Sequence, residues 1–354
     1  MTLALPDLLT VPAGRRAAAE RIGTELRAGR TVALSTHINS DGDGCGSEVA
    51  MAHLLTSRGL EVRIVNPTPW PSMFAFLLEG VDDRTAMGAR AIEEVDLLMV
   101  LDINDVRRLG ALADTVRALH VPRIVIDHHV PSDAPAGDIV MADPAACATG
   151  ELVFDLACVL DLPLTPAIAR ALYTAILTDT GGFRFSNTSP RCHAMAGQLL
   201  AAGVDPEEMY RRIYASVSVG RLRVVREALE SLSVDPAYGL SWVSLPAGAL
   251  ERHHVHAEEL DGIAEYPRSV SGTRMAIFFR ELPHGQVKAS FRSTGSVDVN
   301  RFARQFGGGG HARAAGALIQ GSLDTVRERV LKAAREFVAQ APESRDLAGK
   351  PASL

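Results

Sequence analysis

With 354 residues, the chain is too long for one ordinary hydrophobic core, so two domains are expected. Its hydrophobic and charged fractions, 47% and 22%, are those of a globular protein, and the net charge of −6 argues against a broad electrostatic grip on duplex nucleic acid. The four cysteines form no C-x-x-C pair, no apolar run approaches the ~20 residues that span a bilayer, and the first residues lack a basic signal-peptide start. We therefore expect a cytoplasmic protein without structural disulfides and without a membrane partner.

The first predicted strand, at 31–36, breaks into a loop that contains His37, Asp41 and Asp43 among small residues. A helix is predicted to resume after this loop, with Ser47 as its N-cap. The acids would then lie where a strand ends and a helix begins, which is where open α/β sheets place ligands. This position predicts a functional site, and a metal is one candidate occupant.

Two other interpretations of this loop compete with metal binding. Its glycines alternate as G-x-G-x-G, which is not the spacing of a dinucleotide fingerprint, and the two aspartates would repel a pyrophosphate. A turn rich in Asp and Gly that carries no chemistry also stays open, because these residues populate turns for backbone reasons alone.

Two more strands are predicted at 96–102 and 123–126, and both are nearly unbroken apolar runs of the kind buried in a parallel sheet. The first ends in Asp102 and the second runs into the Asp-His-His triplet 127–129. Because parallel strands end at one edge of a sheet, three strands would deliver His or Asp to the same place. Asp102 as a helix N-cap and His128 as a hydrogen-bonded core histidine remain the structural alternatives.

Predicted helices at 149–160 and 165–177 follow the strands. The second helix ends in the sequence Thr-Asp-Thr-Gly-Gly-Phe-Arg, which supplies a fourth acid, Asp179. The arginine-rich stretch 189–232 is predicted to be helical and to connect the domains, and its charges are most simply a solvated helix face.

From about residue 233 the pattern changes to strands with two helices, predicted at 240–245, 274–279, 286–292, 299–306 and 324–339. In the Gly-rich segment 307–316, backbone N–H groups could approach an anion closely, with His311 and Arg313 beside them. Arg292, at a strand end, could form a fork onto a phosphate or carboxylate. A flexible glycine hairpin with surface arginines is the alternative, and the histidines within 253–256 are interpreted as surface residues.

Two imidazoles and four carboxylates suit a pair of divalent cations such as Mn²⁺ better than one structural zinc. The predicted ligands are His37, Asp41, Asp43, Asp102, His128 and Asp179. The four carboxylates would balance two dications. Such a pair would activate a water and stabilise an in-line displacement at phosphorus, so the residues indicate hydrolysis of a phosphate ester.

The pattern resembles the motifs of the DHH phosphoesterase family. The matching motifs are His37-x-x-x-Asp41-x-Asp43, Asp102, Asp127-His128-His129 and Asp179 with its Thr/Gly-rich surroundings. The run 307–316 resembles the signature of the DHH-associated C-terminal domain. In its length and the close spacing of its motifs, the chain is most similar to the bacterial NrnA-type oligoribonucleases, which also dephosphorylate 3′-phosphoadenosine 5′-phosphate (pAp). Ser40 stands where the family usually has a proline, which changes the stiffness of the loop but removes no ligand.

The resemblance implies a role for each of these residues. One ion would be held by His37, Asp41 and Asp102, and the second by Asp43, Asp102 as the bridge, His128 and Asp179. Asp127 would orient an imidazole and His129 would face the substrate phosphate, so the catalytic residues would be Asp102, Asp127, His128 and His129. Substrate would also be held by Ser290, Arg292, Gly309, Gly310, His311 and Arg313.

The resemblance also implies an α/β fold of two domains with a cleft between them. A catalytic domain with a parallel sheet flanked by helices would span 1–190, a helical linker 191–232, a smaller mixed-sheet domain 233–340 and a flexible tail 341–354. The implied cofactor is two Mn²⁺ per chain, with Mg²⁺ or Co²⁺ as alternatives. The implied substrates are very short single-stranded RNA, dinucleotides and pAp, with no specificity for duplexes, and a homodimer is one option.

Two other classes of function stay open at this point. The enzyme alternatives are a phosphodiesterase for linear or cyclic dinucleotides and a RecJ-like exonuclease for single-stranded DNA. The alternative without catalysis is a nucleotide-sensing module, which the loss of even one acid would have favoured, and none is lost.

Overall fold

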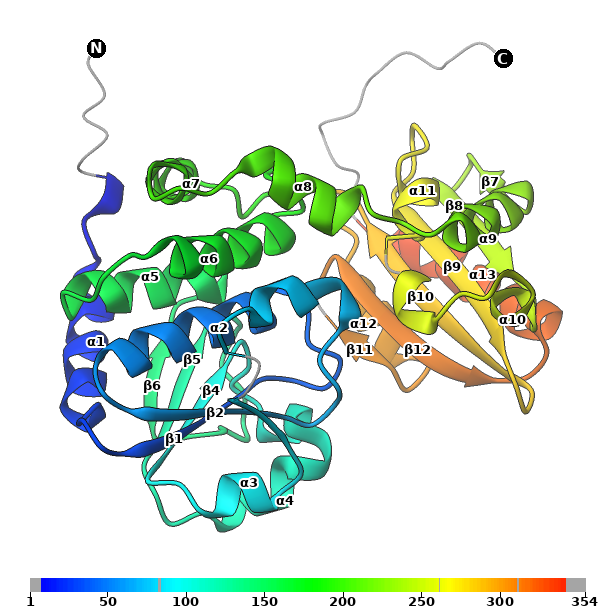
Figure 1. Cartoon of the computed structure of the whole chain (residues 1–354). Helices are drawn as coiled ribbons and strands as arrows, with labels where there is room; N and C mark the ends of the chain where they lie inside the picture. The colour runs from blue at the N-terminus through cyan, green and yellow to red at the C-terminus, as the bar shows by residue number, and fades with distance from the viewer. Residues whose placement is uncertain (1–7, 82–83, 261, 311, 342–354) are drawn as a thin grey trace, which may run out of the picture. The chain divides into compact units, whose positions relative to one another are not determined.

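The computed structural model describes residues 8–81, 84–260, 262–310 and 312–341. The chain divides into two compact units at residues 216 and 217, and Figure 1 shows helices around a sheet in each unit. The division falls inside the segment 191–232, and all but the first residue of the predicted tail lies outside the described residues. No described helix combines the length and apolar character that crossing a bilayer requires.

The first unit is built on a six-stranded sheet in which every neighbouring pair is parallel, in the order β3-β2-β1-β4-β5-β6. The strands are β1 (Thr31–Ser35), β2 (Glu61–Asn66), β3 (Thr85–Met87), β4 (Leu97–Leu101), β5 (Arg123–Asp127) and β6 (Ile139–Ala142). Successive strands run outward from β1 in one direction and then from β4 in the other. The topological switch point, where such sheets bind ligands, therefore lies between β1 and β4.

Helices cover both faces of this sheet. The helices of this unit are α1 (Ala13–Glu25), α2 (Gly42–Ser57), α3 (Arg90–Glu93), α4 (Ala113–Ala118), α5 (Thr149–Val159), α6 (Pro166–Asp179), α7 (Pro190–Ala201) and α8 (Pro206–Tyr214), with the short 3-10 helices η2 (Ser72–Leu78) and η4 (Val106–Leu112). Of these, α7 packs on α6 and not on the sheet (Figure 1). Alternate strand residues point to opposite faces, so Leu34 and Met99 join the core that includes α2, α5 and α6, whereas Ala33 and Leu98 join the core that includes α4. The predicted parallel sheet with helices on both faces is confirmed.

The start of α2 differs from the prediction. The helix begins at Gly42 and not at Ser47, and its N-cap is Asp41, whose carboxylate accepts hydrogen bonds from the backbone N–H groups of Asp43 and Gly44. The glycines let α2 approach α6 closely, because a Cβ on Gly46 would lie 2.4 Å from the carbonyl oxygen of Ala171. The glycine-rich stretch that resembles a loop in sequence is therefore the first turn of a closely packed helix.

The second unit contains a six-stranded mixed sheet in the order β11-β12-β10-β9-β8-β7, in which β8 and β9 are parallel and the other pairs antiparallel. The strands are β7 (Ser233–Asp235), β8 (Leu240–Leu245), β9 (Met275–Leu282), β10 (Gln286–Ser293), β11 (Gly309–Gly310) and β12 (Ala314–Gln320). The helices are α9 (Val219–Glu230), α10 (Ala249–His253), α11 (Glu265–Arg268), α12 (Val299–Arg304) and α13 (Leu323–Gln340), with the 3-10 helix η5 (Ala257–Leu260). The predicted mixed sheet is confirmed. It has six strands, as the first sheet does, and the unit that contains it, Val217–Leu354, is the smaller of the two.

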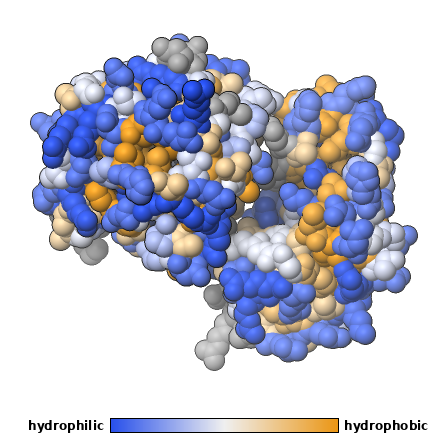
Figure 2. All heavy atoms as spheres, turned by 90° about the horizontal axis from the view of Figure 1, so that it is seen from below, coloured by the Kyte–Doolittle hydropathy of each residue, from blue (hydrophilic) through white to orange (hydrophobic). Residues whose placement is uncertain are grey.

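Each face of the second sheet has its own core. Phe279 and Phe291 pack with residues of α12 and α13, whereas Val243 and Phe278 pack with residues of α9 and α10. On the side of the molecule in Figure 2, hydrophilic surface is interrupted by smaller hydrophobic areas, as on most globular proteins.

Replacing Gly46 with alanine should destabilise the first unit by about 1–3 kcal/mol, because the added methyl group forces α2 away from α6. Urea unfolding followed by circular dichroism measures this loss. Gly197→Ala in α7 is the matched control, since a Cβ there meets no atom within 4 Å. The control should gain about 0.5–1 kcal/mol from helix propensity. A Gly46→Ala protein as stable as the control would contradict the close-packing explanation.

Candidate metal centre

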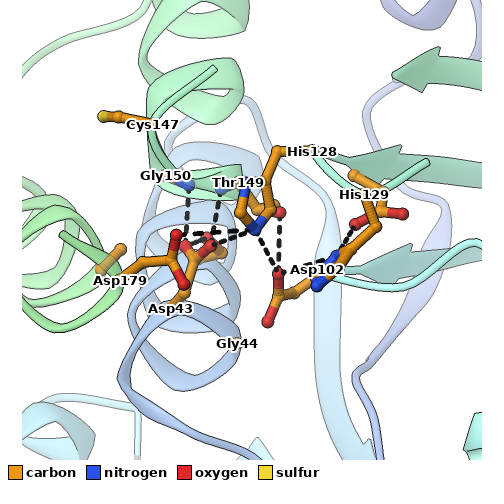
Figure 3. Close-up of polar contacts among 12 residues, drawn as sticks. Asp43, Gly44, Asp102, His128, His129, Cys147, Thr149, Gly150 and Asp179 are labelled. Carbon is orange, nitrogen blue, oxygen red and sulfur yellow. Dashed lines mark hydrogen bonds and ion pairs between the residues drawn. The ribbon is translucent and has the colours of Figure 1, made fainter. Parts of the chain in front are cut away.

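Polar side chains gather at the carboxyl edge of the parallel sheet, beside the switch point. His37 follows β1, Asp102 follows β4 directly, and the triplet 127–129 begins at the last residue of β5. The other predicted acids come from helix ends, and they are Asp41, Asp43 and Asp179. Figure 3 shows the side chains of Asp43, Asp102, His128 and Asp179 directed toward one another. Segments far apart in sequence thus supply one site.

The predicted ligands form groups whose donor atoms all lie within 4.8 Å of one another. One group is His37, Asp41 and Asp102; a second is Asp43, His128 and Asp179; a third is Asp102, His128 and His129. Asp102 links the first two, because its Oδ2 lies 3.4 Å from Nε2 of His37 and its Oδ1 lies 3.6 Å from Nε2 of His128. A carboxylate with one oxygen toward each group is in the position of a bridging ligand.

The imidazole of His37 is oriented as metal-binding histidines usually are. Nδ1 of His37 lies 2.9 Å from the carbonyl oxygen of Ile38 and donates a hydrogen bond to it, so Nε2 is the ring nitrogen that faces Asp102. Among the described residues, neither Nε2 of His37 nor Nε2 of His128 has a hydrogen-bond partner, although both atoms are buried. Buried nitrogens are rarely left without a partner. The donor set of imidazole and carboxylate therefore fits divalent cations.

The electrostatics of the site also favour a bound cation. Burial and the charges of Asp43 and Asp41 raise the pKa of Asp102 well above its ordinary value, and burial together with Asp43 raises the pKa of Asp179 to about 7. Burial lowers the pKa of His37, but Asp102 and Asp41 outweigh this effect and raise it to about 10. Crowded carboxylates are thus costly to keep ionised, and a bound dication would remove that cost.

Asp127 contacts a histidine of its own triplet. Its Oδ1 accepts a hydrogen bond from Nδ1 of His129 at 2.6 Å, and its Oδ2 accepts one from the side-chain amide of Asn104. The amide of Asn104 also donates to the carbonyl oxygen of Val130, 3.2 Å away. The ring of His129 is therefore held in one orientation at the edge of the site.

Sequence reasoning missed three residues that support the acids, namely Asn104, Thr149 and Asn187. The amide of Asn187 donates to Oδ2 of Asp179 at 3.1 Å and to the carbonyl oxygen of Cys147 at 2.8 Å. Thr149 was predicted only as the start of a helix. Nothing in the linear sequence marks these residues, because their partners lie on other elements of the fold.

The second unit brings some of its predicted residues together. Ser290 on β10 is paired in register with Gly316 on β12, and Gly316 is paired with Gly309 on β11, so the three lie in one row across the sheet. Gly310 is paired with Ala315, Arg313 is exposed, and His311 lies outside the described residues.

Arg292 forms an ion pair within its own unit. Its Nε donates to Oε1 of Glu265 at 3.2 Å, and its Nη1 donates to the carbonyl oxygen of Phe291. In the segment 253–256, His253 pairs with Glu227 at 3.0 Å, and the described residues there form no group that could hold a metal.

Comparison with known families matches both units. The model of the DHH family N-terminal domain matches residues 31–176, and the model of the DHHA1 domain matches residues 243–340. Together these matches cover the sheet that carries the predicted metal ligands and most of the sheet that carries the Gly-rich run.

Two curated relatives are similar over most of their length. The bifunctional oligoribonuclease and PAP phosphatase NrnA of Thermus thermophilus is 32% identical over 87% of this chain and 90% of its own. The protein of the same name from Bacillus subtilis is 30% identical over 82% of this chain and 89% of its own.

Solved structures show the same fold. An exopolyphosphatase-related protein from Bacteroides fragilis superposes with a TM-score of 0.82 and 27% identity, covering 92% of this chain and 98% of the other. RecJ from Thermus thermophilus in complex with Mn²⁺ has a TM-score of 0.55 and 16% identity, covering 94% of this chain and 56% of RecJ. The second likeness is one of fold alone.

Saturating Mn²⁺ should raise the Tm of the wild type by about 5–10 °C, because a cation bound only to the folded state stabilises it. Asp102→Asn should lose this shift. Without metal, the variant should be at least as stable as the wild type, since it removes a buried charge crowded by other carboxylates. Differential scanning fluorimetry with and without a chelator measures both effects.

The exposed carboxylate of Asp114, which pairs with Arg117 on the surface of the same unit, provides the control. Asp114→Asn should keep the full response to Mn²⁺. If none of Mn²⁺, Mg²⁺ and Co²⁺ changes the Tm of the wild type, a metal centre at these residues is excluded.

Proposed function

The chain belongs to the DHH family of phosphoesterases and carries a DHHA1 domain, and from this premise we propose that it hydrolyses very short RNA oligonucleotides to mononucleotides and also removes the 3′-phosphate of pAp. The names of the relatives that are 32% and 30% identical over most of the chain support this choice of substrates. The chief structural support is the pair of ligand groups joined by Asp102.

We propose that the cofactor is two Mn²⁺ ions. One would be held by His37, Asp41 and Asp102, and the other by Asp43, Asp102, His128 and Asp179. When bound, such cations lower the pKa of an attacking water and stabilise the charge that develops during in-line displacement at phosphorus. The buried Nε2 atoms of His37 and His128, which have no hydrogen-bond partner in the part of the chain that the structure describes, support this assignment.

The remaining residues of the triplet would act on the substrate. Asp127 holds the ring of His129 through a 2.6 Å hydrogen bond, which is the support that an imidazole needs to contact a phosphate in a fixed geometry. We propose that His129 donates a hydrogen bond to the scissile phosphate, and that Asp127 keeps its ring in the orientation for doing so.

In the second unit, we propose that the terminal phosphate or nucleotide is bound by Ser290, Arg292, Gly309, Gly310, His311 and Arg313. The register that aligns Ser290 with Gly316 and Gly309 supports a shared binding surface for the described members of this set. Recognition of a terminal phosphate concentrates binding energy on the first nucleotides of a substrate, which would explain a preference for short RNA.

A rate comparison tests the proposal directly. The wild type with Mn²⁺ should hydrolyse the dinucleotide pApA and pAp much faster than a long RNA, a deoxyribonucleotide oligomer or a cyclic dinucleotide. Asp102→Ala should lower kcat on pApA about a thousandfold or more, since it removes the proposed bridge of a centre that supplies several kcal/mol. Inert wild-type protein, or an Asp102→Ala variant with full activity, would overturn the assignment.

Arg292→Ala should raise KM for pApA about 10- to 100-fold with a smaller change in kcat, because it removes a charged hydrogen-bond donor to the substrate. Steady-state kinetics separates the two constants. Lys288→Ala removes an exposed positive charge from the same strand, closer to its start, and should leave both constants unchanged. Equal effects from the two variants would indicate a general loss of positive charge and not a specific contact.

A further inference from the structure

Thr149, the first residue of α5, contacts two of the proposed ligands at once (Figure 3). Its backbone N–H donates to Oδ2 of Asp43 at 2.6 Å, and the N–H of Gly150 donates to Oδ1 of the same carboxylate at 2.9 Å. The hydroxyl of Thr149 donates to Oδ1 of Asp102 at 3.0 Å. Thr149 is fully buried, so no solvent competes for these bonds.

These bonds join the two ligand groups. Asp43 belongs to the group with His128 and Asp179, whereas Asp102 completes the group with His37. Because the hydroxyl holds Oδ1 of Asp102 on the side of His128, Oδ2 is turned toward His37, 3.4 Å away. One residue therefore contacts both the linking carboxylate of Asp102 and the carboxylate of Asp43.

The helix itself does not need the hydroxyl of Thr149. The N-cap of α5 is Ala148, which makes no side-chain capping bond, and the hydroxyl of Thr149 bonds to Asp102 and not to the backbone of its own helix. Asp102 adopts a left-handed backbone conformation, φ 63°, that is unfavourable for most residues other than glycine, asparagine and aspartate. An ordinary helix-start role therefore leaves the bond to Asp102 unexplained.

A buried ionic cluster stabilises the first two turns of α5. Nη1 of Arg15 donates to Glu151 at 2.6 Å and to Asp155 at 2.8 Å, and both carboxylates also pair with Arg191. The other oxygen of Glu151 accepts the backbone N–H of Cys147 at 2.9 Å. Buried charges paired in this way resist displacement, so the donors of Thr149 and Gly150 stay at fixed positions.

We propose that Thr149 is a positioning residue whose hydroxyl holds Asp102 in the bridging orientation and thereby couples the two cation positions. This inference rests on the proposed function, because it takes Asp43 and Asp102 as metal ligands. Hydrogen bonds to the ligands of a metal commonly control both its affinity and its geometry. Thr149 would then act on the reaction only through the carboxylates that it orients.

The test compares Thr149→Val, which keeps the shape and the backbone N–H but lacks the hydroxyl, with Thr149→Ser, which restores the hydroxyl. Thr174→Val is the matched control, since Thr174 is equally buried but its hydroxyl donates to the backbone carbonyl of Arg170 in its own helix. Isothermal titration with Mn²⁺ measures affinity, and electron paramagnetic resonance measures the coupling between bound Mn²⁺ ions. Steady-state kinetics on pApA separates kcat from KM.

We expect Thr149→Val to bind Mn²⁺ about 10- to 100-fold more weakly and to lose the spin-coupled signal, with kcat reduced and KM for pApA unchanged. Thr149→Ser should recover most of the affinity and the coupled signal, and Thr174→Val should match the wild type. If Thr149→Val does not fold, Thr149→Ala against Thr149→Ser provides the same comparison, because these two differ by the hydroxyl alone.

Two results would overturn the inference while leaving the proposed function intact. In one, Thr149→Val binds Mn²⁺ with the affinity and coupling of a wild type that itself binds two ions. In the other, Thr149→Ser is as impaired as Thr149→Val, which would assign the effect to packing of the methyl group. A wild type that binds no Mn²⁺ contradicts the proposed function, and with it the inference.

Discussion

The pairing of β1 with β4 in the centre of the parallel sheet is the constraint on which the site depends. Val32 is aligned with Leu97 and Ser35 with Val100, so both strands end at the same height. His37 and Asp102 therefore leave the sheet side by side at its switch point, and β5, paired to β4, brings His128 next to them. A shift in this register would separate the carboxylate of Asp102 from the imidazoles of His37 and His128.

The fold accepts several local costs to keep this arrangement. Asp102 has a left-handed backbone, two imidazole nitrogens are buried without partners among the described residues, and several acids share one region. These costs are offset by donors aimed at the acids, from the start of α5 and from Asn187. Unfavourable local features that the surrounding structure offsets are typical of a functional site. The same features that destabilise the metal-free site would favour cation binding.

Sequence alone was sufficient for the elements whose signal is local. Apolar runs ending in Asp102 and in the triplet 127–129 predict buried parallel strands and the edge at which their acids meet. Sequence reasoning failed for features that depend on contacts between elements distant in the chain or on very short strands. The start of α2 depends on contact between Gly46 and α6, the edge strands β3 and β6 are only three and four residues long, and Thr149 acts on partners distant in the sequence.

The glycines of the run 307–310 do not all serve the same purpose. A Cβ on Gly308 would lie 2.1 Å from the carbonyl oxygen of Gly316, so packing requires glycine there. At Gly310 the backbone has φ 145° and a Cβ would lie 2.6 Å from the carbonyl oxygen of Ala314, so conformation and packing both require glycine. Gly309 is different, because the nearest atom to a Cβ there is Oδ1 of Asn300 at 3.7 Å. Nothing in the described fold requires glycine at this exposed position, which lies in the same row across the sheet as Ser290. A glycine would let a ligand approach the backbone closely at this position, which supports the proposed anion-binding surface more than a flexible hairpin.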